Sequence, residues 1–170
     1  MAKLREPLKD AEACGLPPAL EMMGDRWAFM IVRAGFNGVR HFEDFLEVLG
    51  IARNILSNRL GKLVENGIME REACPEDRRK IEYCLTEKGA DLLPAMIALR
   101  QWGEKYGLGV ASNPVLVDAR DRKPIGAMEI RAHDGRSLGW HELLWQDQSQ
   151  IGMPDEACCG PADRTVQRLD

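Results

Sequence analysis

The stretch that decides the fold runs from Gly50 to Leu85 and reads GIARNILSNRLGKLVENGIMEREACPEDRRKIEYCL. Its first part predicts a helix over Arg53–Asn66, because apolar residues recur at three- and four-residue spacing and form one stripe. The stripe consists of Ile55, Leu56, Leu60, Leu63 and Val64. Asn66-Gly67 predicts the end of this helix, since glycine readily takes the left-handed conformation that is common at helix C-termini.

The second part of the stretch predicts a hairpin of two strands. Ile81, Tyr83 and Leu85 alternate with polar or small neighbours, which is the period-two pattern of a half-buried strand. Pro75-Glu76-Asp77 predicts the turn, and three basic residues follow it directly. A helix followed by a hairpin with a basic flank predicts a winged helix, so we expect an α+β fold that is mainly α.

A second helical pattern, Arg40–Leu49, precedes this stretch and is joined to it by the short connection Gly50-Ile51-Ala52. Two helices joined by a short glycine-containing turn make a helix-turn-helix. The face opposite the apolar stripe carries long or hydrogen-bonding side chains, which could contact phosphates or base edges. They are Arg53, Asn54, Ser57, Asn58 and Lys62. The alternative is that these are ordinary solvated side chains on a surface helix.

Length and composition bound the class of protein. A chain of 170 residues suits one domain, or one domain with an appendage. No apolar run approaches the roughly 20 residues that span a bilayer, and the N-terminus lacks the apolar centre of a secretory signal. Five cysteines without a disulfide-framework spacing predict a reducing cytoplasm. The net charge of −4 gives no global nucleic-acid signal, but residues 53–80 carry 7 basic and 5 acidic side chains.

Several short sequence motifs, taken in order, resemble those of one family. The chain resembles the HxlR-type winged helix-turn-helix transcriptional regulators, which are related to the MarR group. The matching motifs follow one another in the family's order across residues 14–106. They are Cys14, Gly24-Asp25-Arg26-Trp27, His41-Phe42-Glu43-Asp44-Phe45, Gly50-Ile51, Leu56-Ser57-Asn58-Arg59-Leu60, Leu63-Val64-Glu65-Asn66-Gly67 and Tyr83-Cys84-Leu85-Thr86-Glu87-Lys88-Gly89. One departure is Asp25, where the family usually has a second glycine.

This resemblance implies a bacterial homodimer that binds a pseudo-palindromic operator in double-stranded DNA, with Arg53–Asn66 as recognition helix and Cys74–Lys80 as wing. The N-terminal turn of a recognition helix normally enters the major groove. The expected base-reading residues are therefore Arg53, Asn54, Ser57 and Asn58. The expected phosphate or adjacent-groove contacts are Lys62 on the helix and Arg78 and Arg79 on the wing. Arg59, whose neighbours are apolar, stays open as a phosphate contact.

Thr86 to Tyr106 predicts a long helix with Thr86 as its N-cap. Pro94 either kinks this helix or marks a later start, because its ring removes an internal hydrogen bond. The resemblance implies that the helix and the N-terminal segment build the dimer interface. The contacts expected there are Leu92, Met96, Leu99 and Trp102. The alternative is that the helix packs only on its own domain.

Residues 107–146 predict a small β-rich appendage after the domain of residues 14–106, with strands near 114–117 and 127–131 and a turn at Asp134-Gly135. Some longer family members carry a cysteine-rich, zinc-ribbon-like appendage here. No cysteine lies between Cys84 and Cys158, however, and zinc needs about four ligands. We therefore expect no metal and no cofactor. Residues 1–13 predict a flexible arm, and residues 147–170 a disordered tail.

Cys14 occupies the position where redox- or electrophile-sensing members of the family keep a reactive thiol. Such a thiol needs exposure and a lowered pKa; the alternative is a small buried residue. A possible small-molecule or oxidant effector follows from this resemblance.

Two other classes of function compete with a DNA-binding regulator. A winged helix can serve only as a protein-interaction module, but such a face should be more apolar or aromatic than the predicted one. An enzyme is disfavoured, because no nucleophile–base–acid set, glycine-rich phosphate loop or metal spacing occurs in the sequence.

Overall fold

The structure, a computed structural model, describes residues 14–74, 77, 79–107, 114–146, 149 and 151. The chain divides into a larger compact unit that ends at Glu129 and a smaller one that begins at Ile130. The predicted flexible arm, Arg78 and Cys158 lie outside the described residues, as does the predicted tail apart from residues 149 and 151. No described helix is long and apolar enough to cross a membrane.

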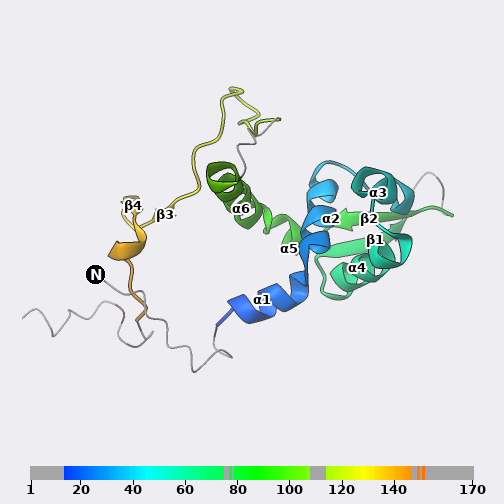
Figure 1. Cartoon of the computed structure of the whole chain (residues 1–170), viewed down its shortest axis with the longest axis horizontal. Helices are drawn as coiled ribbons and strands as arrows, with labels where there is room; N and C mark the ends of the chain where they lie inside the picture. The colour runs from blue at the N-terminus through cyan, green and yellow to red at the C-terminus, as the bar shows by residue number, and fades with distance from the viewer. Residues whose placement is uncertain are drawn as a thin grey trace, which may run out of the picture. The chain divides into compact units, whose positions relative to one another are not determined.

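The larger unit contains six helices and one hairpin among its described residues (Figure 1). In chain order these are α1 (Leu16–Met23), α2 (Arg26–Phe36), α3 (Phe42–Leu49), α4 (Arg53–Glu65), β1 (Met69–Ala73), β2 (Ile81–Leu85), α5 (Glu87–Ala90) and α6 (Leu93–Tyr106). Helix α2 packs against α3, α4 and β2, and α4 packs against β1. This arrangement confirms the expected winged helix-turn-helix fold.

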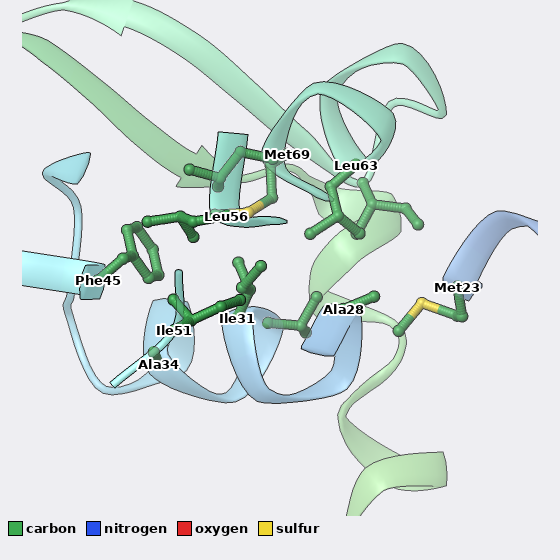
Figure 2. Packing of buried hydrophobic residues seen from close by; sticks show 12 residues of the cluster. Met23, Ala28, Ile31, Ala34, Phe45, Ile51, Leu56, Leu63 and Met69 are labelled. Carbon is green, nitrogen blue, oxygen red and sulfur yellow. The ribbon is translucent and has the colours of Figure 1, made fainter. Parts of the chain in front are cut away.

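The core of this unit is apolar and draws on all its central elements (Figure 2). Leu56, Leu60 and Leu63 of α4 are fully buried against Ile31 of α2 and Phe45 of α3. Burying side chains of this size contributes roughly 1.5–3 kcal/mol each. The prediction that Ile55 belongs to the apolar stripe is wrong. Its side chain is 37% exposed, because it lies beside the side of α4 that carries the buried leucines.

Two glycines shape the turns that follow α3 and α4. Gly50 caps α3 with a φ of 58°, and Gly67 follows α4 with a φ of 66°. Both values lie in the left-handed region that glycine accepts without a Cβ clash. The predicted end of the recognition helix at Asn66-Gly67 is confirmed, with Asn66 as the C-cap.

The wing is an antiparallel hairpin in which Met69 pairs with Leu85 and Ala73 with Ile81. His41, just before α3, forms a further antiparallel bridge to Glu82 of β2, and Tyr83 N donates to the Arg40 carbonyl over 2.8 Å. This bridge fixes the start of α3 to the wing, so the helix-turn-helix and the hairpin form one body.

The long helix predicted over Thr86–Tyr106 is broken. Thr86 caps only the short helix α5, where its Oγ1 accepts from Gly89 N, and α6 begins at Leu93 with Pro94 in its first turn. Of the two readings of Pro94, the later start is confirmed. A proline is tolerated there, because the first-turn N–H groups have no partner inside the helix.

The segment after α6 forms few regular elements among its described residues. Around 114–117 the predicted strand is reduced to a single bridge between Val117 and Pro124. Side-chain bonds hold this segment to α6: Gln101 Nε2 donates to the Gly126 carbonyl over 3.0 Å, and Gln101 Oε1 accepts from Met128 N over 2.7 Å.

Among its described residues, the smaller unit contains a short hairpin and a 3-10 turn. The hairpin pairs β3 (Ile130–Arg131) with β4 (Ser137–Leu138), each strand having two residues, and the turn is η2 (Trp140–Glu142). Gly135 lies between the two strands with a φ of 87°, at the predicted turn. The strand predicted over 127–131 is present only in its last two residues.

Candidate nucleic-acid interface

The candidate interface is the outer face of α4 together with the tip of the wing. The buried residues of α4, Leu56, Leu60 and Leu63, point one side of the helix into the core. The opposite side of the helix therefore faces solvent. The five residues of this helix that the sequence nominates are all exposed: Arg53, Asn54, Ser57, Asn58 and Lys62. Asn54, Ser57 and Asn58, at three- and four-residue spacing, share one side of the helix.

The N-terminus of α4 lies open, because its N-cap residue Ala52 has no side-chain hydrogen bond to offer. The first N–H groups of a helix without such a cap are available to an anion, and the helix dipole favours negative charge there. Asn54 lies in this first turn, and Ser57 lies one turn along the same face. The end of α4 that the resemblance directs to the major groove therefore combines open backbone donors with polar side chains.

Arg53 is exposed but paired. Its Nη1 and Nη2 donate to the two carboxylate oxygens of Glu43 over 2.9 and 2.8 Å, and its guanidinium carbon lies 5.2 Å from the ring centroid of Phe42. Hydrogen bonds from Arg53 to Glu43 raise the pKa of the guanidinium further above its ordinary value. The charge of this arginine is thus balanced within the helix-turn-helix.

At the wing, Arg79 is highly exposed, with 91% of its side chain accessible. Its Nε and its backbone N both donate to Asp77 Oδ1 over 3.1 Å. These bonds hold the pKa of Asp77 below its usual range, the side-chain bond being the larger cause. Lys62, by contrast, forms no ion pair with any residue that the structure describes.

Arg59, which the sequence left open as a phosphate contact, turns inward instead. Its Nε donates to Asp25 Oδ2 over 2.8 Å, its Nη2 donates to the same oxygen, and its Nη1 donates to Asn58 Oδ1 over 2.8 Å. Asp25 also caps α2, where its Oδ1 accepts from Trp27 N over 2.9 Å. The bond from Arg59 is the main cause that lowers the pKa of Asp25.

A second contact holds the other end of α4. Asn66 Nδ2 donates to the Met22 carbonyl over 3.3 Å, and Lys88 Nζ donates to the Asn66 carbonyl over 2.8 Å. Helix α4 is therefore bonded to the α1–α2 junction at two points, by Arg59 with Asp25 and by Asn66 with Met22. Sequence reasoning missed this role of Asp25, although its departure from the family pattern was a visible signal.

The four predicted dimerisation residues fall into two pairs. Leu92 and Met96 are half-buried against the core of their own domain. Leu99 and Trp102 of α6 are 56% and 61% exposed, and Trp102 lies 5.7 Å from the equally exposed Tyr106 between ring centroids. The structure thus leaves an uncovered apolar face on the second half of α6.

Cys14 is partly exposed and lies just before α1, where its Sγ accepts from Leu16 N over 3.5 Å. Cys84, on the wing strand β2, accepts from Arg40 Nη1 over 3.0 Å, and Cys74 is buried. Within the described ranges no group of three or more His, Cys, Asp and Glu side chains is placed to hold a metal ion.

A hairpin set beside a helix-turn-helix, with polar side chains along the second helix, defines a winged helix-turn-helix protein. The sequence pattern of the HxlR-like helix-turn-helix family matches residues 22–109. The chain belongs to this family.

Two relatives, from Mycobacterium and Bacillus, carry the name of HTH-type transcriptional regulators. The chain is 47% identical over 88 residues to the uncharacterised HTH-type transcriptional regulator Rv3095 of Mycobacterium tuberculosis, a match that covers 52% of this chain and 56% of that one. It is 32% identical over 89 residues to the HTH-type transcriptional regulator YodB of Bacillus subtilis, covering 52% of this chain and 80% of YodB. The chain thus spans little more than half the length of the mycobacterial relative.

Solved structures agree with the fold. The crystal structure of PA1607, described as a candidate transcription factor, is 37% identical with a TM-score of 0.73, and the match covers 81% of this chain and 96% of that one. The reduced form of YodB is 28% identical with a TM-score of 0.50, covering 58% of this chain and 98% of YodB.

Proposed function

We propose that this protein is a transcriptional regulator that binds a specific DNA sequence through α4 and the wing. The observation that carries the proposal is the exposed polar face of α4 with Asn54, Ser57 and Asn58, set by the buried leucines behind it. Amide and hydroxyl groups at the start of such a helix are suited to base edges in the major groove. Lys62 and Arg79 supply the phosphate contacts.

We further propose that the regulator acts as a homodimer on a pseudo-palindromic operator. The exposed apolar residues Leu99 and Trp102 on α6 support this, because aromatic and aliphatic side chains of this size favour burial in an interface. A two-fold dimer presents two recognition helices to half-sites about one helical turn apart, about 34–36 Å. Leu92 and Met96 then support α6 from within the subunit.

Regulation by an oxidant or another electrophile is the third part of the proposal. Cys14 is partly exposed, so a small reagent in solution can reach its sulfur. The relative YodB has a structure named as its reduced form, which associates that protein with a redox state. The position of Cys14 next to α1 would transmit a modification to the α1–α2 junction and from there to α4.

Selection of random DNA duplexes by the purified protein tests the binding proposal. We expect the recovered sequences to share an inverted repeat, and Asn54→Ala to change the preferred bases within each half. Recovery of no common sequence, with binding of similar strength to every duplex, would contradict specific binding. Such a result would favour the use of the winged helix as a protein-interaction module.

A further inference from the structure

The guanidinium of Arg53 is fixed by two neighbouring residues of α3. Glu43 accepts from both terminal nitrogens over 2.9 and 2.8 Å, and the Phe42 ring lies beneath the guanidinium at 5.2 Å. The guanidinium has five N–H donors, and this carboxylate takes one from each terminal nitrogen. The end of the guanidinium that carries both terminal nitrogens is therefore occupied, whereas Nε and the second hydrogen of each terminal nitrogen are not used by Glu43.

A phosphate or a guanine competes for these same nitrogens. A contact with guanine O6 and N7, or with two phosphate oxygens, that uses both terminal nitrogens needs the end of the guanidinium that Glu43 holds. Arg53 cannot make this end-on contact until the carboxylate has been released, and at its free Nε edge the negative charge of Glu43 still offsets the attraction to a phosphate. Both side chains are well exposed, 65% for Arg53 and 69% for Glu43, so the exchange needs no rearrangement of the core.

We propose that Glu43 is a specificity-determining residue that competes with DNA for Arg53 and so weakens binding to phosphates at any sequence. The inference rests on the proposed function, because it concerns the same surface. A carboxylate in this place restrains the attraction of the Arg53 charge to phosphates, which are the same at every sequence. The side chains of Asn54, Ser57 and Asn58, which have no charge, are left to distinguish one sequence from another.

The expected size of the effect follows from the exposure of the pair. Exposed ion pairs change equilibrium constants by up to about fivefold. Release of one cation onto a phosphate also steepens the fall of log K with log salt by about 0.9. Glu43→Gln keeps the shape of the side chain and should raise affinity for a scrambled duplex by about this factor for each recognition helix.

Asp44→Asn is the matched control. Asp44 is the next residue along, lies in the same first turn of α3, is exposed, and pairs with no cation among the described residues. The control therefore removes the same charge from the same region, and the same helix-dipole interaction, without releasing Arg53. Far-UV circular dichroism and the melting temperature show whether each variant is folded.

The experiment is a fluorescence-anisotropy titration of a scrambled duplex at several salt concentrations. We expect Glu43→Gln to bind more tightly than Asp44→Asn and with the steeper salt slope. In an Arg53→Ala background the two substitutions should have equal effects. Equal affinities of the two single variants, weaker binding by Glu43→Gln, or an excess that persists without Arg53 would overturn the inference.

A heparin column separates this inference from the proposed function. Heparin is a polyanion without base edges, so later elution of Glu43→Gln than of Asp44→Asn supports competition for Arg53 even if no duplex is bound. Absence of duplex binding by the wild type and every variant would contradict the proposed function alone. Identical elution of the two variants would contradict the competition alone.

Discussion

Replacing Asp25 by asparagine tests how the recognition helix is held. The carboxylate of Asp25 joins two helices: Oδ1 accepts from Trp27 N at the start of α2, and Oδ2 accepts from Arg59 Nε of α4 over 2.8 Å. The asparagine side chain keeps one oxygen for the cap but places an NH2 donor opposite the donors of Arg59, so the bonds from Arg59 are lost together with the charge. The substitution Asp25→Asn therefore removes the contact with Arg59 and keeps the cap.

The magnitude follows from the loss of the bonds from Arg59. A hydrogen bond to a charged group contributes about 1.5–3 kcal/mol, and an exposed ion pair about 1 kcal/mol or less. Side-chain exposures of 26% for Arg59 and 33% for Asp25 place the pair between surface and core, so we expect a loss of about 1 kcal/mol. Asp25→Ala also loses the cap, worth about 1 kcal/mol, and should cost about 2 kcal/mol in all.

The pH dependence gives a second, independent signature. Arg59 holds the pKa of Asp25 below its ordinary value in the folded protein, whereas the unfolded chain titrates near about 3.9. The stabilisation is therefore fully present above the unfolded pKa and is lost as the pH falls through the folded pKa. The difference between wild type and Asp25→Asn should be constant from pH 7 to about 5 and shrink below about 3.9.

Urea unfolding followed by tryptophan fluorescence measures these differences. We expect Asp25→Asn to lower the free energy of unfolding by about 1 kcal/mol at neutral pH with an unchanged m value. An unchanged free energy at pH 7 would refute the proposed link between α2 and α4. A loss of the same size at pH 3 would show that it does not depend on the charge of Asp25.

Four further substitutions test the surface assignments. Asn54→Ala should change sequence preference by about 1–3 kcal/mol at one base pair, measured with duplexes altered one position at a time; a uniform loss across all duplexes would contradict base reading. Arg79→Ala should weaken every duplex similarly and flatten the salt slope by about 0.9, and an altered base preference would speak against a phosphate contact. Trp102→Glu should shift the protein toward monomer in sedimentation experiments while the far-UV circular dichroism is kept, because the side chain is 61% exposed within the chain. Cys14→Ser should abolish any loss of DNA binding on treatment with diamide or a quinone, and an undiminished response would exclude this thiol as the sensor.

Much of the winged helix-turn-helix could be predicted from residue spacing. Leu56, Leu60 and Leu63 recur on one face, so their burial and the exposure of Asn54 and Ser57 follow from the geometry of a single helix. Gly50 and Gly67 likewise mark turns whose backbone has a positive φ, a requirement set by neighbouring residues of the chain. These features depend on residues close together in the chain.

The side-chain partners could not be predicted in this way. Arg59 and Asp25 are 34 positions apart, and Arg53 and Glu43 are 10 apart, so each pairing depends on how the helices pack. The same limit explains the strands predicted near 114–117 and 127–131. Short apolar runs indicate burial, but side chains of α6 bond part of this backbone: Gln101 bonds Gly126 and Met128, and Arg100 Nη2 donates to the Pro114 carbonyl. Only parts of the two runs therefore pair with another strand or bridge.

The most direct test of the central claim is a titration of the DNA upstream of the protein's own gene against a scrambled duplex of equal length, at two salt concentrations. We expect tighter binding to the upstream DNA, and weaker binding to both duplexes at the higher salt, with log K falling by about 0.9 per unit of log salt for each phosphate contacted. Equal, micromolar affinity for both duplexes that does not change with salt would contradict it.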